Sequence, residues 1–391
     1  MSRELYIITP WYNTFAGGAE VAARTLAEEC VNRGIKVTIL TTCCKSPQEN
    51  WWRDSIDTKE EFVNGVRVLR FKLNTDGKEK YEQTIVKQMH HEPLTYEDKE
   101  NFYRHGINSN ELITYIKTIP REIPVLVMPY FQSLAYSVVV DNPNRITMIP
   151  CFHDEEQFYW EQIDEMIHKC KGLIYLSEPE KDLVINQYGL KYGKKVIESL
   201  VIGVGVEIER NLLTEIEEKP NKVDIPNEYF VYVGRKDRGK GVVELIEYHK
   251  QVISDIPIIF LGGGDNSLIP NNEKKFIDLG FVDSKIKYQI IKNAKALINL
   301  SNNESFSIVL MEAWLLGIPT IVSSKCNVTR YHCIVNEGGF YIDNANDYSK
   351  AIEYILDHPE QCKTMGKKGK EYVEKNYSWD TVISKLYKSL G

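Results

Sequence analysis

The chain has 391 residues, of which 43% are hydrophobic and 26% are charged, and its formal net charge is −7. This length predicts two domains of ordinary size, and the composition is that of a soluble globular protein. The acidic balance argues against a general nucleic-acid binder, because such proteins usually carry a basic surplus.

The first half of the chain alternates strand-like and helical patterns. Residues 4–10 predict a strand, residues 20–34 predict a helix that Gly34 ends, and residues 36–42 predict a second strand. This order is typical of a βαβ unit, which implies a parallel sheet. Further buried strands are expected at residues 66–71, 125–131, 145–151 and 172–177.

Two segments interrupt this alternation. Residues 73–117 are polar, charged and helical in tendency, and we interpret them as an insertion on the first domain. Residues 201–226 are rich in Glu and Lys and end at Pro226. Such a shift in composition is typical of a domain boundary, so we expect two domains joined near residues 203–222.

The pattern restarts after this boundary. Residues 227–234 predict a strand, residues 235–241 (RKDRGKG) a basic loop with glycines, and residues 242–253 a helix. Further strands are expected at residues 257–265, 296–301 and 319–324. Both halves therefore predict doubly wound α/β domains, in which ligands bind beyond the carboxyl ends of the strands. Two such edges facing each other would form one deep cleft.

The stretch ESFSIVLME at residues 304–312 places a glutamate on each side of a predicted helix start. We expect the helix to begin near Ser307, so free N–H groups from Phe306 to Val309 would form an anion site suited to phosphate. Glu304 would then accept from sugar hydroxyls and Glu312 from ribose hydroxyls. The alternative is that Glu304 is solvated and Glu312 pairs with a buried cation.

Two glycine-bearing loops follow strands of the second domain. In the basic loop, Arg235 and Lys240 would neutralise a diphosphate, the alternative being an ordinary solvated loop. The turn at residues 262–265 (GGGD) does not match a dinucleotide fingerprint, because Ser267 stands where the third glycine is needed. A plain tight turn is therefore favoured there over a close approach to a nucleotide.

His153 and Asp154 follow a predicted strand of the first domain. Such a pair can position a sugar hydroxyl or polarise a group, although a structural histidine is the alternative. No two aspartates are spaced D-x-D, a pattern common where carboxylates hold a metal on a diphosphate. We therefore expect no metal, with the basic loop and the helix dipole in its place.

The order of these features resembles the retaining glycosyltransferases of the GT-B fold, specifically family four. The resemblance rests on Gly17-Gly18 after the first strand, His153-Asp154, the VGRKDRGKG loop, the turn near Gly264 and the E-x7-E motif. Residues 281–323 are its most specific stretch. It covers nearly the whole chain and is weakest between about residues 73 and 125.

The resemblance implies the architecture in more detail. Residues 1–205 would form a Rossmann-like domain on the acceptor side. Residues 206–371 would form a second one on the nucleotide-sugar side, facing the first across a cleft. Residues 372–391 would form a helix that crosses back onto the first domain.

The resemblance also implies roles for single residues. Arg235 and Lys240 would hold the donor diphosphate, and the backbone after Phe306 would cradle phosphate. His153 would face the transferred sugar, and the Gly17-Gly18 loop would close over phosphate or acceptor. The implied catalytic residues are His153, Arg235, Lys240 and Glu304. The implied donor-binding residues are Gly17, Gly18, Gly234, Arg235, Lys240, Gly263, Glu304, Ser305, Phe306, Ser307, Ile308, Val309 and Glu312.

The chain departs from the family pattern at two positions. Ser307 stands where the family often has glycine, which implies a less close approach of the backbone to a ligand. Asp265 stands where proline commonly follows the glycine-rich turn.

The implied activity is transfer of a sugar from a nucleoside-diphosphate sugar to the hydroxyl of a glycan or lipid-linked acceptor, as in surface polysaccharide assembly. Configuration would be retained by a front-face route, with no cofactor and no metal, because no carboxylate stands out as a nucleophile. The alternatives are a nucleotide-sugar epimerase and a non-catalytic nucleotide-sugar-binding scaffold.

We expect a cytoplasmic protein. The N-terminus carries no extended apolar segment, and no window reaches about 18 uninterrupted apolar residues. The eight cysteines are scattered, which is typical of reduced thiols. Lys191, Tyr192, Lys194 and Lys195 suggest a peripheral contact with the inner membrane face, although an ordinary solvated turn is the alternative.

Overall fold

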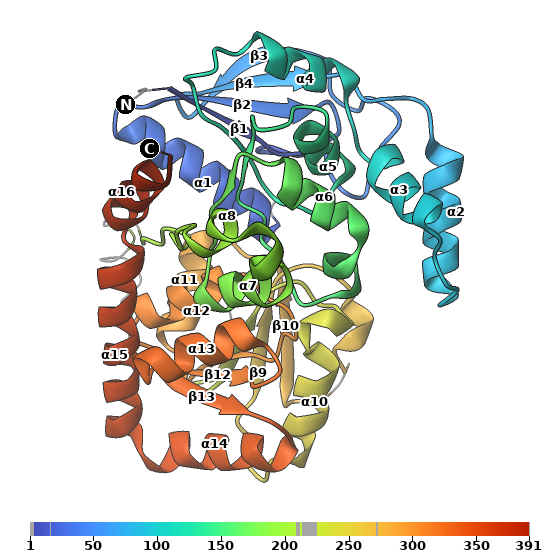
Figure 1. The fold of residues 1–391 in the computed structure, drawn as a ribbon. Coiled ribbons are helices and arrows are strands. Elements are labelled where there is room, and N and C mark those ends of the chain that lie inside the picture. Colours follow the sequence, from blue (N-terminus) through green and yellow to red (C-terminus); the bar gives the residue numbers. More distant parts are fainter. Residues whose placement is uncertain (1–3, 16, 209–211, 213–224, 271–272, 391) are drawn as a thin grey trace. The chain divides into compact units, whose positions relative to one another are not determined.

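The computed structural model describes residues 4–15, 17–208, 212, 225–270 and 273–390. The chain divides into two compact units, one formed by Met1–Gly205 with Val382–Gly391 and the other by Val206–Thr381. Residues 372–381 therefore belong with the second unit, whereas we expected the closing segment to begin at residue 372. Each unit is an α/β domain built on one sheet (Figure 1).

The sheet of the first unit has the strand order β3-β4-β2-β1-β5-β6-β7. All pairs are parallel except β3 with β4. The strands are β1 (Glu4–Ile8), β2 (Lys36–Thr42), β3 (Glu60–Val63), β4 (Val66–Phe71), β5 (Val125–Val127), β6 (Thr147–Met148) and β7 (Gly172–Leu173). The helices are α1 (Gly18–Asn32), α2 (Lys78–Met89), α3 (Tyr96–His105), α4 (Asn110–Tyr115), α5 (Ser133–Val140), α6 (Glu161–Lys169), α7 (Glu178–Tyr192), α8 (Lys194–Ile197) and, from residue 382 on, α16 (Trp379–Leu390).

Our sequence reading found six of these strands and missed β3. That strand pairs with β4 through a hairpin whose turn residues, Asn64 and Gly65, have φ values of 50° and 80°. Asn-Gly is the strongest short-range signal for such a turn, so the hairpin was recognisable from the sequence. The segment 73–117 is helical, as expected, and forms α2, α3 and α4.

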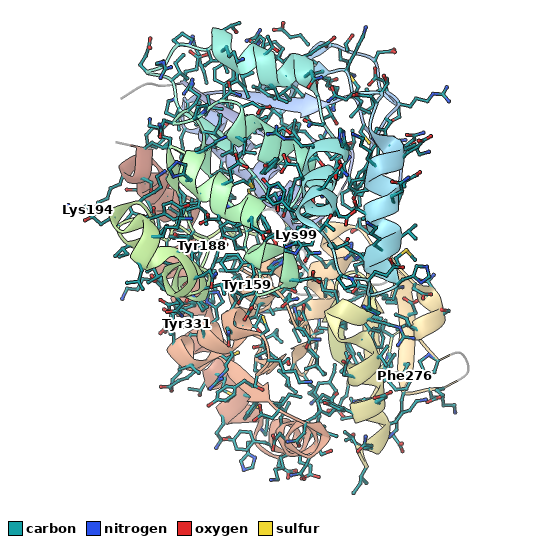
Figure 2. All side chains as sticks on the ribbon, turned by 45° about the vertical axis from the view of Figure 1, so that its right-hand side comes forward. Lys99, Tyr159, Tyr188, Lys194, Phe276 and Tyr331 are labelled. Carbon is teal, nitrogen blue, oxygen red and sulfur yellow. The ribbon has the colours of Figure 1, made fainter. Side chains whose placement is uncertain are left out.

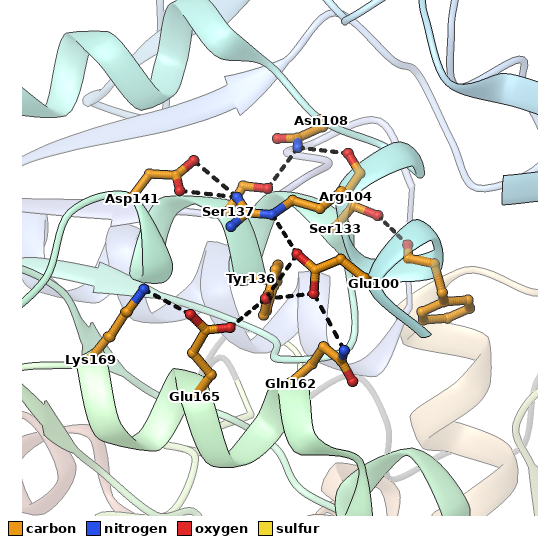
Figure 3. A network of polar contacts seen from close by, with 11 residues as sticks. Glu100, Arg104, Asn108, Ser133, Tyr136, Ser137, Asp141, Gln162, Glu165 and Lys169 are labelled. Atoms are coloured by element: carbon orange, nitrogen blue, oxygen red, sulfur yellow. Dashed lines mark hydrogen bonds and ion pairs between the residues drawn. The ribbon is translucent and has the colours of Figure 1, made fainter. Parts of the chain in front are cut away.

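A polar network joins the insertion helix α3 to α5 and α6 (Figure 3). Arg104 on α3 bonds both carboxylate oxygens of Asp141 at 3.0 and 3.1 Å and pairs with Glu100 one turn earlier. The hydroxyl of Tyr136 on α5 lies 2.6 Å from Glu165 on α6 and 3.0 Å from Glu100. These bonds add to the ring contacts by which Phe102 and Tyr103 of α3 pack against Tyr136 and Trp160.

The sheet of the second unit is parallel throughout, with the order β10-β9-β8-β11-β12-β13. Its strands are β8 (Phe230–Val233), β9 (Ile258–Leu261), β10 (Phe276–Gly280), β11 (Leu297–Asn299), β12 (Thr320–Ser323) and β13 (Gly339–Ile342). Its helices are α10 (Val242–Gln251), α11 (Ser284–Lys292), α12 (Ile308–Leu315), α13 (Asn327–Asn336), α14 (Ala345–Asp357) and α15 (Pro359–Tyr377).

The two edge strands of this sheet, β10 and β13, were missed. Both are short and only partly buried, so neither shows a continuous apolar run. Phe276, labelled in Figure 2, opens β10. Its ring packs edge-on against His249 of α10, with 5.9 Å between the ring centres. This contact with a neighbouring helix, which no local pattern reports, anchors the edge strand.

Two glycines on α15 fix the position of α12. A Cβ at Gly366 would lie 1.9 Å from the carbonyl oxygen of Gly317, and one at Gly369 would lie 2.3 Å from the indole of Trp314. The helices therefore approach more closely than other residues permit. This packing sets the direction in which α12 presents its N-terminus.

Each sheet has the doubly wound order in which the winding reverses once, between β1 and β5 in the first and between β8 and β11 in the second. In open α/β sheets, ligands bind beyond the carboxyl ends of the strands at this point. The loops that follow β8, β9 and β11 are therefore the candidate site of the second unit, and those that follow β1, β5 and β6 are the candidates in the first.

Candidate functional site

The turn between β11 and α12 carries the E-x7-E motif. The helix begins at Ile308, one residue later than predicted, because Ser307 has φ 71° and ψ 77° and serves as its N-cap. Among the residues that the structure describes, none accepts the N–H groups of Ile308 and Val309. The positive end of the α12 dipole therefore carries free N–H donors, and the N–H groups of Phe306 and Ser307 likewise have no acceptor among the described residues, so the predicted range from Phe306 to Val309 stands.

One hydrogen bond and two aromatic contacts support the turn between β11 and α12. Asn299 at the end of β11 donates to the Ser307 hydroxyl at 3.3 Å. Phe306 is buried and packs edge-on against Tyr377 at 4.8 Å and His332 at 5.6 Å between ring centres. Burial lowers the pKa of His332 to about 3, so this ring is neutral at ordinary pH. These contacts keep the free N–H groups at the start of α12 in place.

Lys240 and Glu304 form an ion pair. The ammonium nitrogen lies 2.8 Å from a carboxylate oxygen, and both side chains are mostly buried, with 32% and 16% of their surface exposed. The pair joins the basic loop after β8 to the turn after β11, and the backbone bond from Asn302 to Gly239 at 3.3 Å supports the same junction. Two residues predicted separately from the sequence thus meet, and neither is simply solvated.

Arg235 lies on the open side of the basic loop. Its side chain is 65% exposed and pairs with Asp237 two residues later, at 2.5 Å. Asp237 also accepts the backbone N–H of Lys240 at 2.9 Å, which closes the short turn 238–240. The sequence reading did not use Asp237, yet it organises the loop that carries both cations.

Lys236 is the cation that sequence reasoning missed. Its ammonium group is fully buried and lies 2.7 Å from both carboxylate oxygens of Asp278 on β10. Its backbone bonds the neighbouring turn, accepting from Asp265 at 2.9 Å and donating to Gly263 at 2.8 Å. A buried ammonium group needs such a partner, so Lys236 secures the loop.

The glycine-rich turn after β9 is explained by this neighbouring loop. A Cβ at Gly262 would lie 2.2 Å from the carbonyl oxygen of Gly234, and one at Gly264 would lie 2.5 Å from that of Lys236. Gly262, Gly264 and Gly234 also have positive φ. The glycines are therefore required by contact between two protein loops, whereas Gly263 faces open space.

Glu312, buried on α12, is only half satisfied. Lys287 donates to one carboxylate oxygen at 2.7 Å and Tyr288 donates to the same oxygen at 3.0 Å, both from α11. The other oxygen, Oε2, is buried without a hydrogen-bond partner among the described residues. The alternative of a cation partner therefore holds for one oxygen, while the second is an unpaired buried acceptor, which is uncommon in folded proteins.

The loop after β6 in the first unit carries His153. The imidazole faces Glu155, with 3.7 Å between Nδ1 and Oε1, whereas Asp154 accepts from Tyr159 at 2.7 Å. The two side chains therefore have different partners, and the predicted role of His153 at a sugar hydroxyl stays a prediction. Glu155 also accepts from Tyr130 at 2.5 Å. Burial raises the pKa of Glu155, but the bonds from His153 and Tyr130 outweigh it and bring the pKa below its usual value.

Gly17 and Gly18 lie at the start of α1, beyond the carboxyl end of β1. Gly17 is the N-cap, and a Cβ there would lie 2.1 Å from the carboxylate of Glu20. Gly18 opens the helix and has free space around it. Gly17 is therefore needed for a contact within the helix turn, while Gly18 leaves room for a ligand.

The suggested membrane-contact residues are largely engaged within the fold. Lys191 pairs with Asp164, and Tyr192 donates to the same carboxylate at 2.9 Å. Lys195 donates to three backbone carbonyls around the end of α6, which is a C-terminal cap. Lys194 has 89% of its side chain exposed and pairs with Glu198 one turn later, at 3.6 Å. In the described parts of the chain, no helix combines the length and apolar character needed to cross a membrane.

A family model described as "Glycosyl transferases group 1" matches residues 214–372. Over 233 residues the chain is 27% identical to the capsular polysaccharide biosynthesis glycosyltransferase CapM of Staphylococcus aureus, covering 55% of this chain and 60% of that one. Over 190 residues it is 27% identical to a trehalose synthase of Pyrococcus horikoshii, covering 44% and 45%. The chain thus spans about half the length of these curated relatives.

Similarity to a solved structure extends over the whole chain. Alr3699/HepE of Anabaena, solved in complex with UDP and glucose, superimposes with a TM-score of 0.68 at 12% identity, covering 100% of this chain and 99% of that one. At this identity the likeness establishes the fold. The chain therefore has the fold of GT-B glycosyltransferases, and its residues 214–372 match the glycosyl transferases group 1 model.

Proposed function

We propose that the protein transfers a sugar from a nucleoside-diphosphate sugar to an acceptor hydroxyl, with retention of configuration. One observation carries the proposal. The N-terminus of α12 offers free N–H groups, the unpaired oxygen of Glu312 lies on the same helix, and Glu304, which pairs with Lys240 of the loop after β8, lies in the turn before it. An anion site flanked by two carboxylates suits a ligand with phosphates and hydroxyls on both sides.

Each group then has a chemical role in donor binding. The free oxygen of Glu312 accepts from a ribose hydroxyl. Glu304 accepts from the sugar while Lys240, which has three N–H donors, keeps its bond to Glu304 and turns another donor to a phosphate oxygen. Arg235, exposed beside Asp237, binds the diphosphate with its fork of donors.

Bond cleavage is assisted at the leaving group. As the bond between the anomeric carbon and the phosphate oxygen breaks, positive charge develops on the ring and negative charge on the diphosphate. Arg235, Lys240 and the N–H groups of Ile308 and Val309 stabilise that negative charge. The acceptor hydroxyl attacks from the same face, and its proton passes to the departing phosphate oxygen. Cations and the helix dipole supply the charge compensation that a metal supplies elsewhere.

His153 is proposed to contact the transferred sugar. Glu155 on the Nδ1 side leaves Nε2 as the atom free to meet a sugar hydroxyl. The acceptor is proposed to be a glycan or a lipid-linked sugar, in line with the capsular polysaccharide relative, and the reaction is proposed to take place in the cytoplasm.

The first experiment is thermal unfolding with UDP, GDP, ADP, CMP or dTDP, each with and without EDTA. A ligand at 100 times its Kd stabilises the fold by about 2.7 kcal/mol. We expect one nucleotide to raise the Tm, with no effect of EDTA. UDP is the first choice, because it is the nucleotide bound in the structural neighbour. No shift with any of the five would favour the non-catalytic scaffold.

The second experiment tests the leaving-group residues. Arg235→Ala and Lys240→Ala should each lower turnover by at least about 100-fold without unfolding the protein. Lys295→Ala is the matched control, because Lys295 pairs with Glu228 at 2.6 Å just before β8, at the opposite edge of the same sheet. Near-normal turnover in both site variants would refute the assignment. Product analysis with and without acceptor separates a transferase from an epimerase.

A further inference from the structure

The buried carboxyl group of Glu180 contacts the loop after β6 that carries His153, called here the His153 loop. Glu180, in the first turn of α7, is only 1% exposed. Its Oε1 accepts the N–H of Phe152 at 2.7 Å, and its Oε2 accepts the N–H of Leu176 at 2.6 Å. Among the described residues, no Lys, Arg or His forms an ion pair with it. The carboxyl group is thus held by backbone donors, so its role lies in the backbone it binds.

These two donors come from different strand ends. Leu176 lies beyond β7 and Phe152 beyond β6, and β6 and β7 are neighbouring parallel strands. The Glu180 carboxyl group therefore bridges the carboxyl edges of both strands. Because Phe152 directly precedes His153, this bridge fixes the point from which the His153 loop leaves the sheet.

The loop needs such a restraint. Cys151, next to Phe152, has φ 59°, a left-handed conformation that costs a non-glycine residue about 1 kcal/mol or more. Such a conformation persists only where the surroundings hold it. Burial raises the pKa of Glu180 to about 8, against the backbone bonds from Leu176 and Phe152, which lower it. A carboxyl group is thus kept at a position that is unfavourable for its charge.

Helix capping alone does not account for these contacts. Ser177 and Glu180 have the spacing of a capping box, and the Ser177 hydroxyl accepts the Glu180 N–H at 3.3 Å. In α3 the corresponding Asp98 closes its box on Thr95 itself. Glu180 reaches further, to a residue 28 positions earlier in the sequence.

We propose that Glu180 is a positioning residue for His153, holding the His153 loop in the conformation that turnover requires. The positioning follows from the contacts above, and its effect on turnover rests on the proposed function. Glu180 itself touches neither substrate nor reacting atoms.

The test compares Glu180→Gln with Ser177→Ala. Glutamine has one accepting oxygen and one donating nitrogen, so one of the two backbone N–H groups then faces a donor. Ser177→Ala removes a cap of the same helix and leaves the Phe152 bond intact, which makes it the matched control. Hydrogen exchange of residues 150–155 is the first readout, and reaction of His153 with diethylpyrocarbonate is the second.

We expect Glu180→Gln to speed exchange of the Phe152 amide at least about 10-fold and to change the modification rate of His153, whereas Ser177→Ala changes neither. With UDP-glucose as the probe, kcat should fall about 10-fold with KM within twofold. If Glu180→Gln does not fold, Glu180→Asp, which keeps the carboxyl group on a shorter side chain, should give an intermediate result.

The outcomes separate the two proposals. Equal exchange in Glu180→Gln and Ser177→Ala overturns the positioning role. Faster exchange with unchanged kcat overturns its link to turnover. Faster exchange in a protein whose wild type turns over no nucleotide sugar keeps the positioning role and refutes the proposed function instead.

Discussion

The unpaired oxygen of Glu312 makes the sharpest prediction about donor binding. If Oε2 accepts a ribose hydroxyl, Glu312→Ala removes one hydrogen bond to a charged acceptor, which is worth about 1.5–3 kcal/mol. This corresponds to a loss of roughly 10- to 150-fold in nucleotide affinity. Glu312→Gln still offers a polar group at that position, so we expect a smaller loss, roughly 3- to 10-fold.

The stability effect of the same change should be modest. Glu312→Ala leaves the Lys287 ammonium without its partner, but 22% of that side chain is already exposed and can gain water. We therefore expect the free energy of unfolding to fall by about 1–2 kcal/mol, less than for a fully buried pair. A folded variant that binds weakly is the expected result.

Isothermal titration calorimetry with the nucleotide found in the thermal screen measures the affinity. Tyr288→Phe is the matched control, because it removes a bond to the other oxygen of the same carboxylate and leaves Oε2 unchanged. We expect its affinity to stay within about threefold of the wild type. A Glu312→Ala protein that binds the nucleotide as tightly as the wild type would refute the ribose assignment, and Glu312 would then serve only to pair with Lys287.

Three further predictions concern stability. Gly262→Ala should lower the free energy of unfolding by at least about 2 kcal/mol, because its Cβ would lie 2.2 Å from a carbonyl oxygen, whereas Gly263→Ala, in open space, should cost less than about 1 kcal/mol. Ser307→Gly should stay within about 1 kcal/mol of the wild type, since relief of a positive φ offsets the lost hydroxyl bond, whereas Ser307→Val should cost more than about 1 kcal/mol. Burial lowers the pKa of His249 to about 4. As pH falls below about 6.5, His249 therefore becomes protonated in the unfolded chain but stays neutral in the folded protein. Stability contributed by neutral His249 is therefore complete above that pH and falls by roughly 3 kcal/mol by pH 4, and His249→Gln should flatten this part of the curve.

Urea unfolding at fixed pH measures the two backbone predictions, and the same experiment repeated between pH 7.5 and pH 4.5 measures the third. Equal costs for Gly262→Ala and Gly263→Ala would contradict the close approach of the two loops. A Ser307→Val protein as stable as Ser307→Gly would show that the backbone relaxes at this turn. Parallel pH curves for the wild type and His249→Gln would mean that His249 titrates normally in the folded protein.

Much of the fold follows from the local sequence. Strands such as β5 and β9 are continuous apolar runs, because both faces of a parallel sheet are covered, and such runs are visible without a structure. A glycine-bearing loop between a strand and a helix indicated where each of the two units begins. The edge strands β10 and β13 were missed for the same physical reason, since a half-covered strand has no continuous apolar run.

The residue types of the site were also recognisable from the sequence, because a charge within an apolar helix, such as Glu312, is conspicuous. What the sequence could not decide was which charges meet. Lys240 lies 64 residues from Glu304, Lys236 lies 42 from Asp278, and Lys287 lies 25 from Glu312. Local periodicity reports which face of an element is buried, but not which loops the sheet order brings together. The tertiary structure alone therefore decided that one oxygen of Glu312 is paired and the other is free.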